Sequence, residues 1–65
     1  MEAYTVSGLS TDATLSMTKT CNTYDLAEEL FELMKNSNIY YDVRIVNNYT
    51  NKIEKHICNE LSASH

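Results

Sequence analysis

The chain has 65 residues with nine acidic and five basic side chains, so its formal net charge is -4 at neutral pH. Such an acidic chain is a poor binder of nucleic-acid phosphates or of an anionic membrane, because both need a basic face. No apolar run approaches the roughly 18 residues that cross a bilayer, and residues 1–8 lack the basic and apolar regions of a signal peptide. We therefore expect one small cytoplasmic domain with reduced thiols.

Two short strands are expected in the first third of the chain. Residues 3–7 alternate apolar and polar side chains and predict the first strand. Residues 14–21 alternate again, and their threonines suit a pleated surface with one wet face. Residues 9–13 are rich in Ser, Thr and Asp and predict the loop between the strands. Gly8 is the only glycine, and we expect it at a turn or a bulge.

The stretch 23–38 predicts an amphipathic helix and is the best-defined element of the chain. At about 100° per residue, one side collects apolar residues and the opposite side acidic ones. Asn22 or Thr23 would cap the first free amides. Leu30 lies near the middle of the apolar side, so we expect its truncation to weaken the domain badly. The apolar residues are Leu26, Ala27, Leu30, Phe31, Leu33 and Met34, and the acidic ones are Asp25, Glu28, Glu29 and Glu32.

A hairpin is expected after the helix. Residues 39–47 predict the strongest strand, residues 48–51 the turn and residues 52–58 the returning strand. Leu61 would pack as a last anchor, and residues 62–65 would form a frayed tail. In the strand 39–47, one face carries Tyr41, Val43 and Ile45, and the other carries Tyr40, Asp42, Arg44 and Val46.

The predicted order is β-β-α-β-β, which gives a small two-layer α+β domain over residues 1–61, an antiparallel sheet with one amphipathic helix packed on one face. The alternative, β-α-β-β, merges the first two strands into irregular structure. A single helix leaves the second sheet face open. We expect this face, with Tyr40, Arg44 and Val46, to form a homodimer interface in which Arg44 pairs with Asp42 of the second copy.

The chain carries no recognisable catalytic, cofactor or metal motif. One glycine excludes a glycine-rich phosphate loop, and no Ser, His and Asp combination stands out. We expect a protein without enzymatic activity, cofactor or metal. Cys21 and Cys58 are the only cysteines, and we expect two semi-buried thiols. The alternatives are a disulfide, or a metal site completed by His56 and His65.

The acidic side of the predicted helix is the most distinctive candidate site. Its four carboxylates fall within eight positions, and no basic residue lies four positions after Asp25, Glu28 or Glu29. Such a row imitates the charges of a nucleic-acid backbone and suits a basic groove on a partner protein. The alternative is an ordinary solvated face. Tyr49 at the hairpin tip is a second expected contact, because exposed tyrosines are common at interfaces.

The small size, the acidity and the absence of catalytic motifs resemble the small accessory proteins that phages make to inhibit host machinery, although no particular residues carry this resemblance. It implies a protein that binds and inhibits or regulates another protein, such as one that handles nucleic acid or acts in defence. A phage-encoded chain would act in the host cytoplasm. The alternative is a small homo-oligomeric scaffold or assembly subunit.

Overall fold

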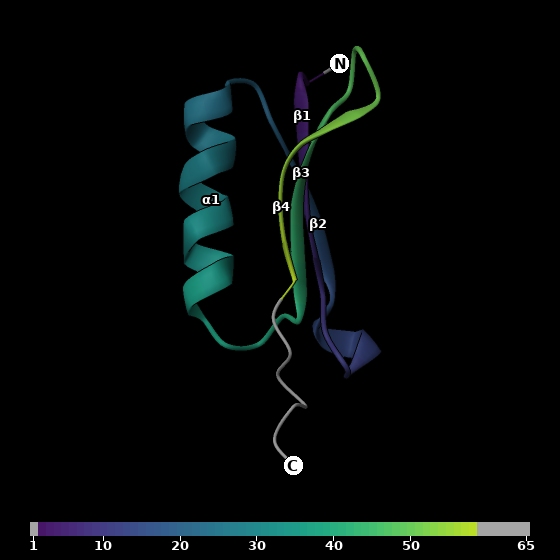
Figure 1. Cartoon of the computed structure of the whole chain (residues 1–65), viewed down its shortest axis with the longest axis vertical. Helices are drawn as coiled ribbons and strands as arrows, with labels where there is room; N and C mark the ends of the chain where they lie inside the picture. Colours follow the sequence, from purple (N-terminus) through teal and green to yellow (C-terminus); the bar gives the residue numbers. More distant parts are fainter. Residues whose placement is uncertain (1, 59–65) are drawn as a thin grey trace.

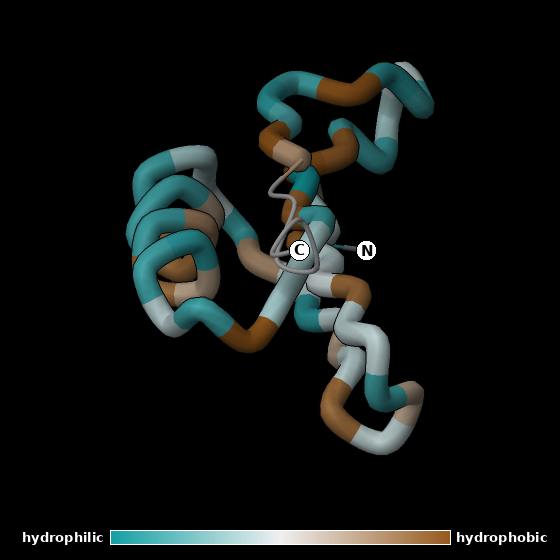
Figure 2. Tube along the Cα trace, turned by 60° about the horizontal axis from the view of Figure 1, so that its bottom comes forward, coloured by the Kyte–Doolittle hydropathy of each residue, from teal (hydrophilic) through white to brown (hydrophobic). Residues whose placement is uncertain are grey.

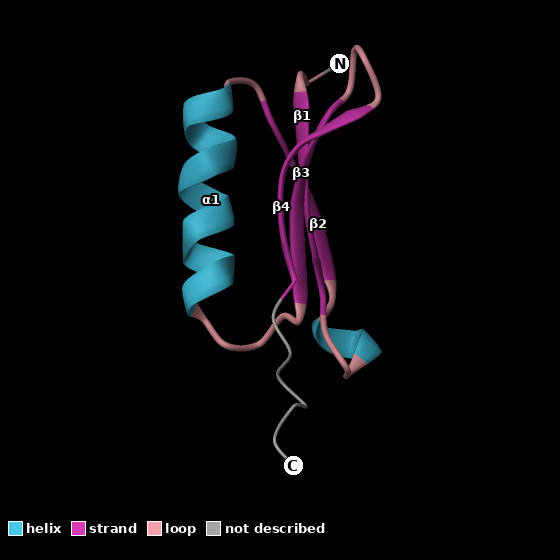
Figure 3. Cartoon of the chain, in the orientation of Figure 1, coloured by secondary structure: helices cyan, strands magenta, loops and turns pink. Residues whose placement is uncertain are grey.

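The computed structural model describes residues 2–58, which form a four-stranded antiparallel sheet with one α-helix packed along one face (Figure 1). The strand order across the sheet is β2-β1-β3-β4. The two-layer α+β fold and the β-β-α-β-β order are confirmed, and the alternative without the first hairpin is wrong (Figure 3). Leu61 and the tail 62–65 lie outside the described residues. The elements are β1 (Tyr4–Leu9), the short 3-10 helix η1 (Ala13–Leu15), β2 (Met17–Cys21), α1 (Tyr24–Asn36), β3 (Asp42–Asn47) and β4 (Lys52–Cys58).

The only glycine lies inside a central strand. Gly8 is in β1, opposite Met17 of β2 and Val43 of β3, so the expected turn or bulge is wrong. A Cβ at this position would lie 2.7 Å from the Tyr40 ring and would collide with the end of Met34. Glycine is needed here because two core side chains lie directly on the backbone.

Local signals set the ends of α1. The Leu26 N–H donates to Thr23 Oγ1 at 3.3 Å, so Thr23 is the N-cap, as the sequence allows. At the other end, the Ser37 side chain donates to the Met34 carbonyl at 2.7 Å. Asn38, directly after Ser37, has a positive φ of 62° in the left-handed region, which ends the helix.

The buried side of α1 is narrower than its apolar side. Leu26 and Leu33 are 52% and 66% exposed, and Leu30 is only half-buried, so the sheet covers only part of the predicted apolar side. A helix buries only the stripe that touches the sheet, and α1 packs mainly over β1 and β3 rather than over β2. Figure 2 shows mainly hydrophilic residues on the outer side of this helix. The buried residues of α1 are Ala27, Phe31 and Met34.

The chain enters β3 later than the alternation predicts. Asn38 turns the backbone, and the Tyr41 N–H donates to the Leu9 carbonyl at 2.9 Å before β3 begins at Asp42. Because this approach is not part of the strand, alternation does not hold there. Tyr40 is 7% exposed and lies in the core under α1, whereas Tyr41 is half-buried. The placement of Tyr40 on the open face, and in a dimer interface there, is therefore wrong.

A bulge interrupts the pairing of β3 with β4. Ile45 lies opposite Lys55, but Val46 lies opposite Ile53, so Glu54 is the extra residue. Opposite residues share a face, which places Ile53 with Val46 on the open face. Simple alternation along 52–58 would place Ile53 and Lys55 on one face, but the bulge places them on opposite faces, and Ile53 is 53% exposed.

The two cysteines lie at opposite edges of the sheet. Cys21 is buried in β2, and Cys58 is exposed in β4. Three strand spacings of about 4.8 Å separate the two strands, which is more than the roughly 7 Å that a disulfide can join. The disulfide alternative within one chain is wrong. His65, which the metal alternative needs, lies outside the described residues.

Candidate functional site

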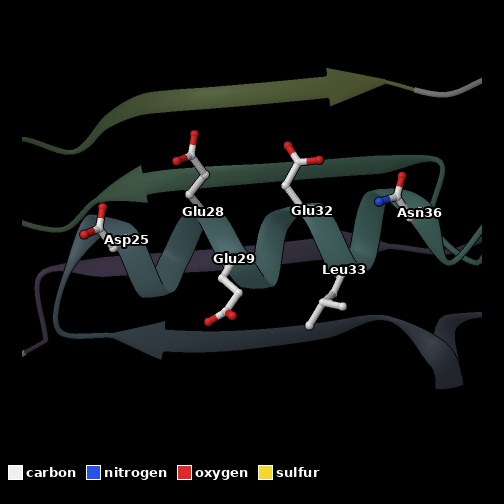
Figure 4. A pocket seen from close by; sticks show the side chains of 6 residues that line it. All are labelled: Asp25, Glu28, Glu29, Glu32, Leu33 and Asn36. Atoms are coloured by element: carbon white, nitrogen blue, oxygen red, sulfur yellow. The ribbon is translucent and has the colours of Figure 1, made fainter.

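The structure divides the predicted acidic row between two flanks of α1. Glu28 and Glu32 point toward β4, whereas Glu29 and Leu33 point toward β2 (Figure 4). Asp25 lies in the first turn, where a carboxylate suits the helix dipole. The four carboxylates do share the exposed side of one helix, as predicted. Their electrostatic surroundings, however, differ from one flank to the other.

The flank toward β4 is neutralised by a lysine that the sequence analysis missed. Lys55 Nζ lies 2.9 Å from Glu28 Oε2 and 3.5 Å from Glu32 Oε2, and 5.0 Å from the centre of the Phe31 ring. Lys35 Nζ also lies 2.9 Å from Glu32 Oε1. The hydrogen bond with Glu28 raises the pKa of Lys55, and the hydrogen bond with Lys35 lowers the pKa of Glu32. Lys55 belongs to β4, so the spacing of charges along the helix cannot reveal it. Its alternation with Ile57 in β4 does indicate a side chain that faces α1.

The flank toward β2 keeps its negative charge. Asp25 and Glu29 are exposed and form no ion pair with any residue in the described range 2–58. Beside them, α1 and β2 enclose a shallow groove of about 380 Å³. Glu2, Lys19 and Glu29 are the charged residues that line it. The apolar lining of the groove comes from Met17, Leu26, Leu30 and Leu33, together with Cys21. The leucines that the core leaves uncovered therefore form one wall of a groove.

The open face of the sheet carries a second group of charges, centred on Asp42. Its carboxylate lies 2.9 Å from His56 Nε2 and accepts hydrogen bonds from Arg44 Nε and Nη2 at 3.2 and 3.1 Å. Burial would raise the pKa of Asp42, but the hydrogen bonds from His56 and Arg44 outweigh it, and the pKa lies below its usual value. Arg44 thus pairs with Asp42 of its own strand, which corrects the expected pairing between two copies. Arg44 and Val46 do lie on the open face, and a dimer formed there stays a prediction.

Tyr49 lies apart from the acidic side of α1. It is 66% exposed, as predicted, in the turn between β3 and β4. The Asn47 side chain holds this turn by accepting hydrogen bonds from the Tyr49 and Thr50 N–H groups at 2.8 and 3.2 Å. The turn points away from α1 (Figure 1). Tyr49 and the carboxylates therefore form two surfaces rather than one site.

Across residues 2–58, no three His, Cys, Asp or Glu side chains lie together as possible metal ligands. No helix in this range is long and apolar enough to span a bilayer. No protein-family model matches the chain, and the comparisons with curated proteins and with solved structures give no match.

Proposed function

We propose that this chain is a small non-enzymatic protein that binds another protein through the exposed side of α1 and thereby inhibits or regulates it. The observation that supports this function is that exposed leucines of α1 lie next to carboxylates that form no ion pair in the described residues. Leu26 and Leu33 are more than half exposed, and Asp25 and Glu29 lie beside them. An apolar patch with a charged rim is typical of protein interaction sites.

The negative charge of this surface favours a partner with a basic surface. Asp25 and Glu29 form no ion pair within the described residues, and the whole chain carries a net charge of -4. A partner with a basic groove would be attracted to this side of α1 at long range, which raises the association rate and makes it sensitive to salt. Proteins that handle nucleic acid have such grooves. The proposal therefore includes a phage-type accessory inhibitor of host nucleic-acid-handling or defence machinery, acting in the host cytoplasm.

The test compares two pairs of neutralised carboxylates. One variant combines Asp25→Asn with Glu29→Gln, which removes charge from the proposed site and breaks no ion pair seen in the structure. The matched control combines Asp12→Asn with Glu54→Gln, which removes the same charge from the N-cap of η1 and from β4. Affinity capture from a lysate of the source cells, followed by mass spectrometry, identifies the partner. The affinity of the purified partner is then measured at low and at high salt.

We expect the α1 variant to bind more than about tenfold more weakly, which corresponds to roughly 1.4 kcal/mol, and the control to bind like the parent. Circular dichroism verifies that both variants are folded. Equal affinities of the two variants would remove Asp25 and Glu29 from the binding surface. Capture of this chain alone would favour the scaffold alternative, with self-association through the open face that carries Arg44 and Val46.

A further inference from the structure

The outer edge of β2 is unpaired. In the order β2-β1-β3-β4, β2 pairs only with β1, and in the described part of the chain no element lies beyond it. The register with β1 runs without a bulge from Met17 to Cys21. An edge strand of this kind presents a row of free N–H and C=O groups, to which another extended segment can add.

The groove lies directly above this edge. Opposite residues of an antiparallel pair share a face, so Met17, opposite Gly8, and Lys19, opposite Val6, both face α1. Leu26 and Leu33 on α1 form the other wall. A strand added to β2 would place every second side chain in this groove, against the two leucines. Backbone pairing and burial of exposed apolar surface would then occur in the same complex.

The charges on the groove favour a basic segment. Glu29 points from α1 toward β2 (Figure 4), and Glu2 accepts a hydrogen bond from the Thr20 hydroxyl beside the groove. Lys19 is the single basic residue in the lining. Two carboxylates against one ammonium group therefore favour a Lys or Arg on the added strand.

A second copy of this chain fits the groove less well than a foreign strand. With both helices on the same side of a joined sheet, the central antiparallel registers place Lys19 opposite itself, opposite Met17 or opposite Cys21 of the other copy. A lysine would then enter an apolar groove or face a like charge. Because α1 packs mainly over β1 and β3, the two helices would lie about 19 Å apart, at about 4.8 Å per strand. Packed helices lie about 8–10 Å apart, so the leucines of the two copies would not meet.

We infer that β2 and the groove above it bind an extended segment of a partner protein by strand addition, with large apolar side chains at alternate positions and a Lys or Arg beside them. This inference rests on the proposed function, because it names the kind of segment that a partner would present to the β2 flank of α1. It adds the backbone of β2 as the element that sets affinity, and the groove as the element that sets sequence preference.

The first experiment selects binders from a display library of short random peptides, using the whole purified chain as the target. We expect the selected peptides to alternate apolar and polar residues and to contain Lys or Arg. Their affinities are then measured for Leu26→Gln and Leu33→Gln, and for the matched control Leu15→Gln. Leu15 is 50% exposed, close to the 52% of Leu26, but it lies in η1, outside the groove. Each groove variant should bind more than about tenfold more weakly, and the control should bind like the parent.

The second experiment tests backbone pairing with synthetic versions of a selected peptide. N-methyl groups are placed on alternate residues, at odd positions in one version and at even positions in the other. An added strand pairs along one edge only, so one version should lose binding and the other should keep it.

The outcomes separate this inference from the proposed function. If no peptide is selected, or if the groove variants bind like the control, strand addition in the groove is overturned. If both N-methylated versions bind equally while the groove variants lose binding, strand addition is overturned but α1 remains a protein-binding surface. If the groove variants lose partner binding but the Asp25 and Glu29 variant does not, only the proposed role of charge is overturned.

Discussion

The two edge strands of this sheet meet α1 in opposite ways. On one edge, Lys55 of β4 reaches Glu28, Glu32 and the Phe31 ring, and a bulge at Glu54 interrupts the strand. The neighbouring edge residues of β4 include several charged side chains. On the other edge, β2 has no bulge and a single charged residue, and it faces leucines that nothing in the described part of the chain covers.

The comparison shows which edge is protected against pairing. Native sheets blunt their edges with lysines, bulges and inward-pointing charges, because a flat edge pairs with other chains. β4 has all of these devices, whereas β2 has Lys19 alone. The same molecule therefore contains a closed edge and an open one, and the open edge borders the apolar groove. Differences in stability between the two flanks of α1 can test this contrast.

The largest effect is expected for truncation of Phe31, the aromatic residue of α1 whose ring lies next to Lys55 of β4. Phe31→Ala removes a 2%-exposed ring from the centre of the core, and such changes cost about 3–5 kcal/mol. A domain with total stability near the lower end of about 5–15 kcal/mol would keep about 2 kcal/mol or less. Urea denaturation measures the loss. Leu33→Ala, on the open flank, is the comparison and should change stability by less than about 0.5 kcal/mol.

The structure also lowers the loss of stability that we expect for truncation of Leu30. Because Leu30 is half-buried in the wall of the groove, Leu30→Ala should cost less than Phe31→Ala. Equal losses for Phe31→Ala and Leu33→Ala would show that the two flanks do not differ.

A smaller effect, with a defined pH dependence, is expected at Asp42, which links β3 to β4. Asp42→Asn removes the charge that His56 and Arg44 hold, and hydrogen bonds to charged groups contribute about 1.5–3 kcal/mol. The pKa of Asp42 is lower in the folded protein than in the unfolded chain. Its contribution is therefore complete above the ordinary carboxyl pKa and is lost as the pH falls through the lower, folded value.

Unfolding curves recorded at neutral pH and at decreasing pH below about 4 measure this dependence. The difference between the parent and Asp42→Asn should be largest at neutral pH and should shrink in acid. A difference that stays constant over this range would mean that the Asp42 carboxylate does not stabilise the fold through its charge. Glu29→Gln, which breaks no hydrogen bond or ion pair seen in the described residues, is a control for removal of a carboxylate.

The smallest effect is expected for the lysine that joins the closed edge to the helix. Lys55→Met removes the ion pairs with Glu28 and Glu32 and keeps an unbranched apolar stem. Because these groups are exposed, the melting temperature should fall only slightly, and the difference from the parent should become smaller at high salt. Lys19→Met on the open edge should leave the melting temperature unchanged. A larger loss for Lys19→Met would reverse the assignment of closed and open edges.

Much of the fold follows from signals that act over a few residues. The helix, its cap at Thr23 and the bounds of β4 are set by local periodicity and capping, and all three agree with the structure. Local signals failed where a residue depends on distant neighbours. Tyr40 is buried because the chain turns at Asn38 before β3 begins, and Gly8 is required because Tyr40 and Met34 lie on it.

The sequence by itself determined the two-layer architecture and the exposed acidic side of α1, because 2-residue and 3.6-residue periodicities decide which side chains can share a face. Only the tertiary structure decided how the two flanks of that helix differ. The strand order places Lys55 beside Glu28 on one flank and ends the sheet at β2 on the other, under Leu26 and Leu33. These contacts join residues that are far apart in the chain, so no periodicity within one element can encode them, and the groove along β2 exists only once the sheet is assembled.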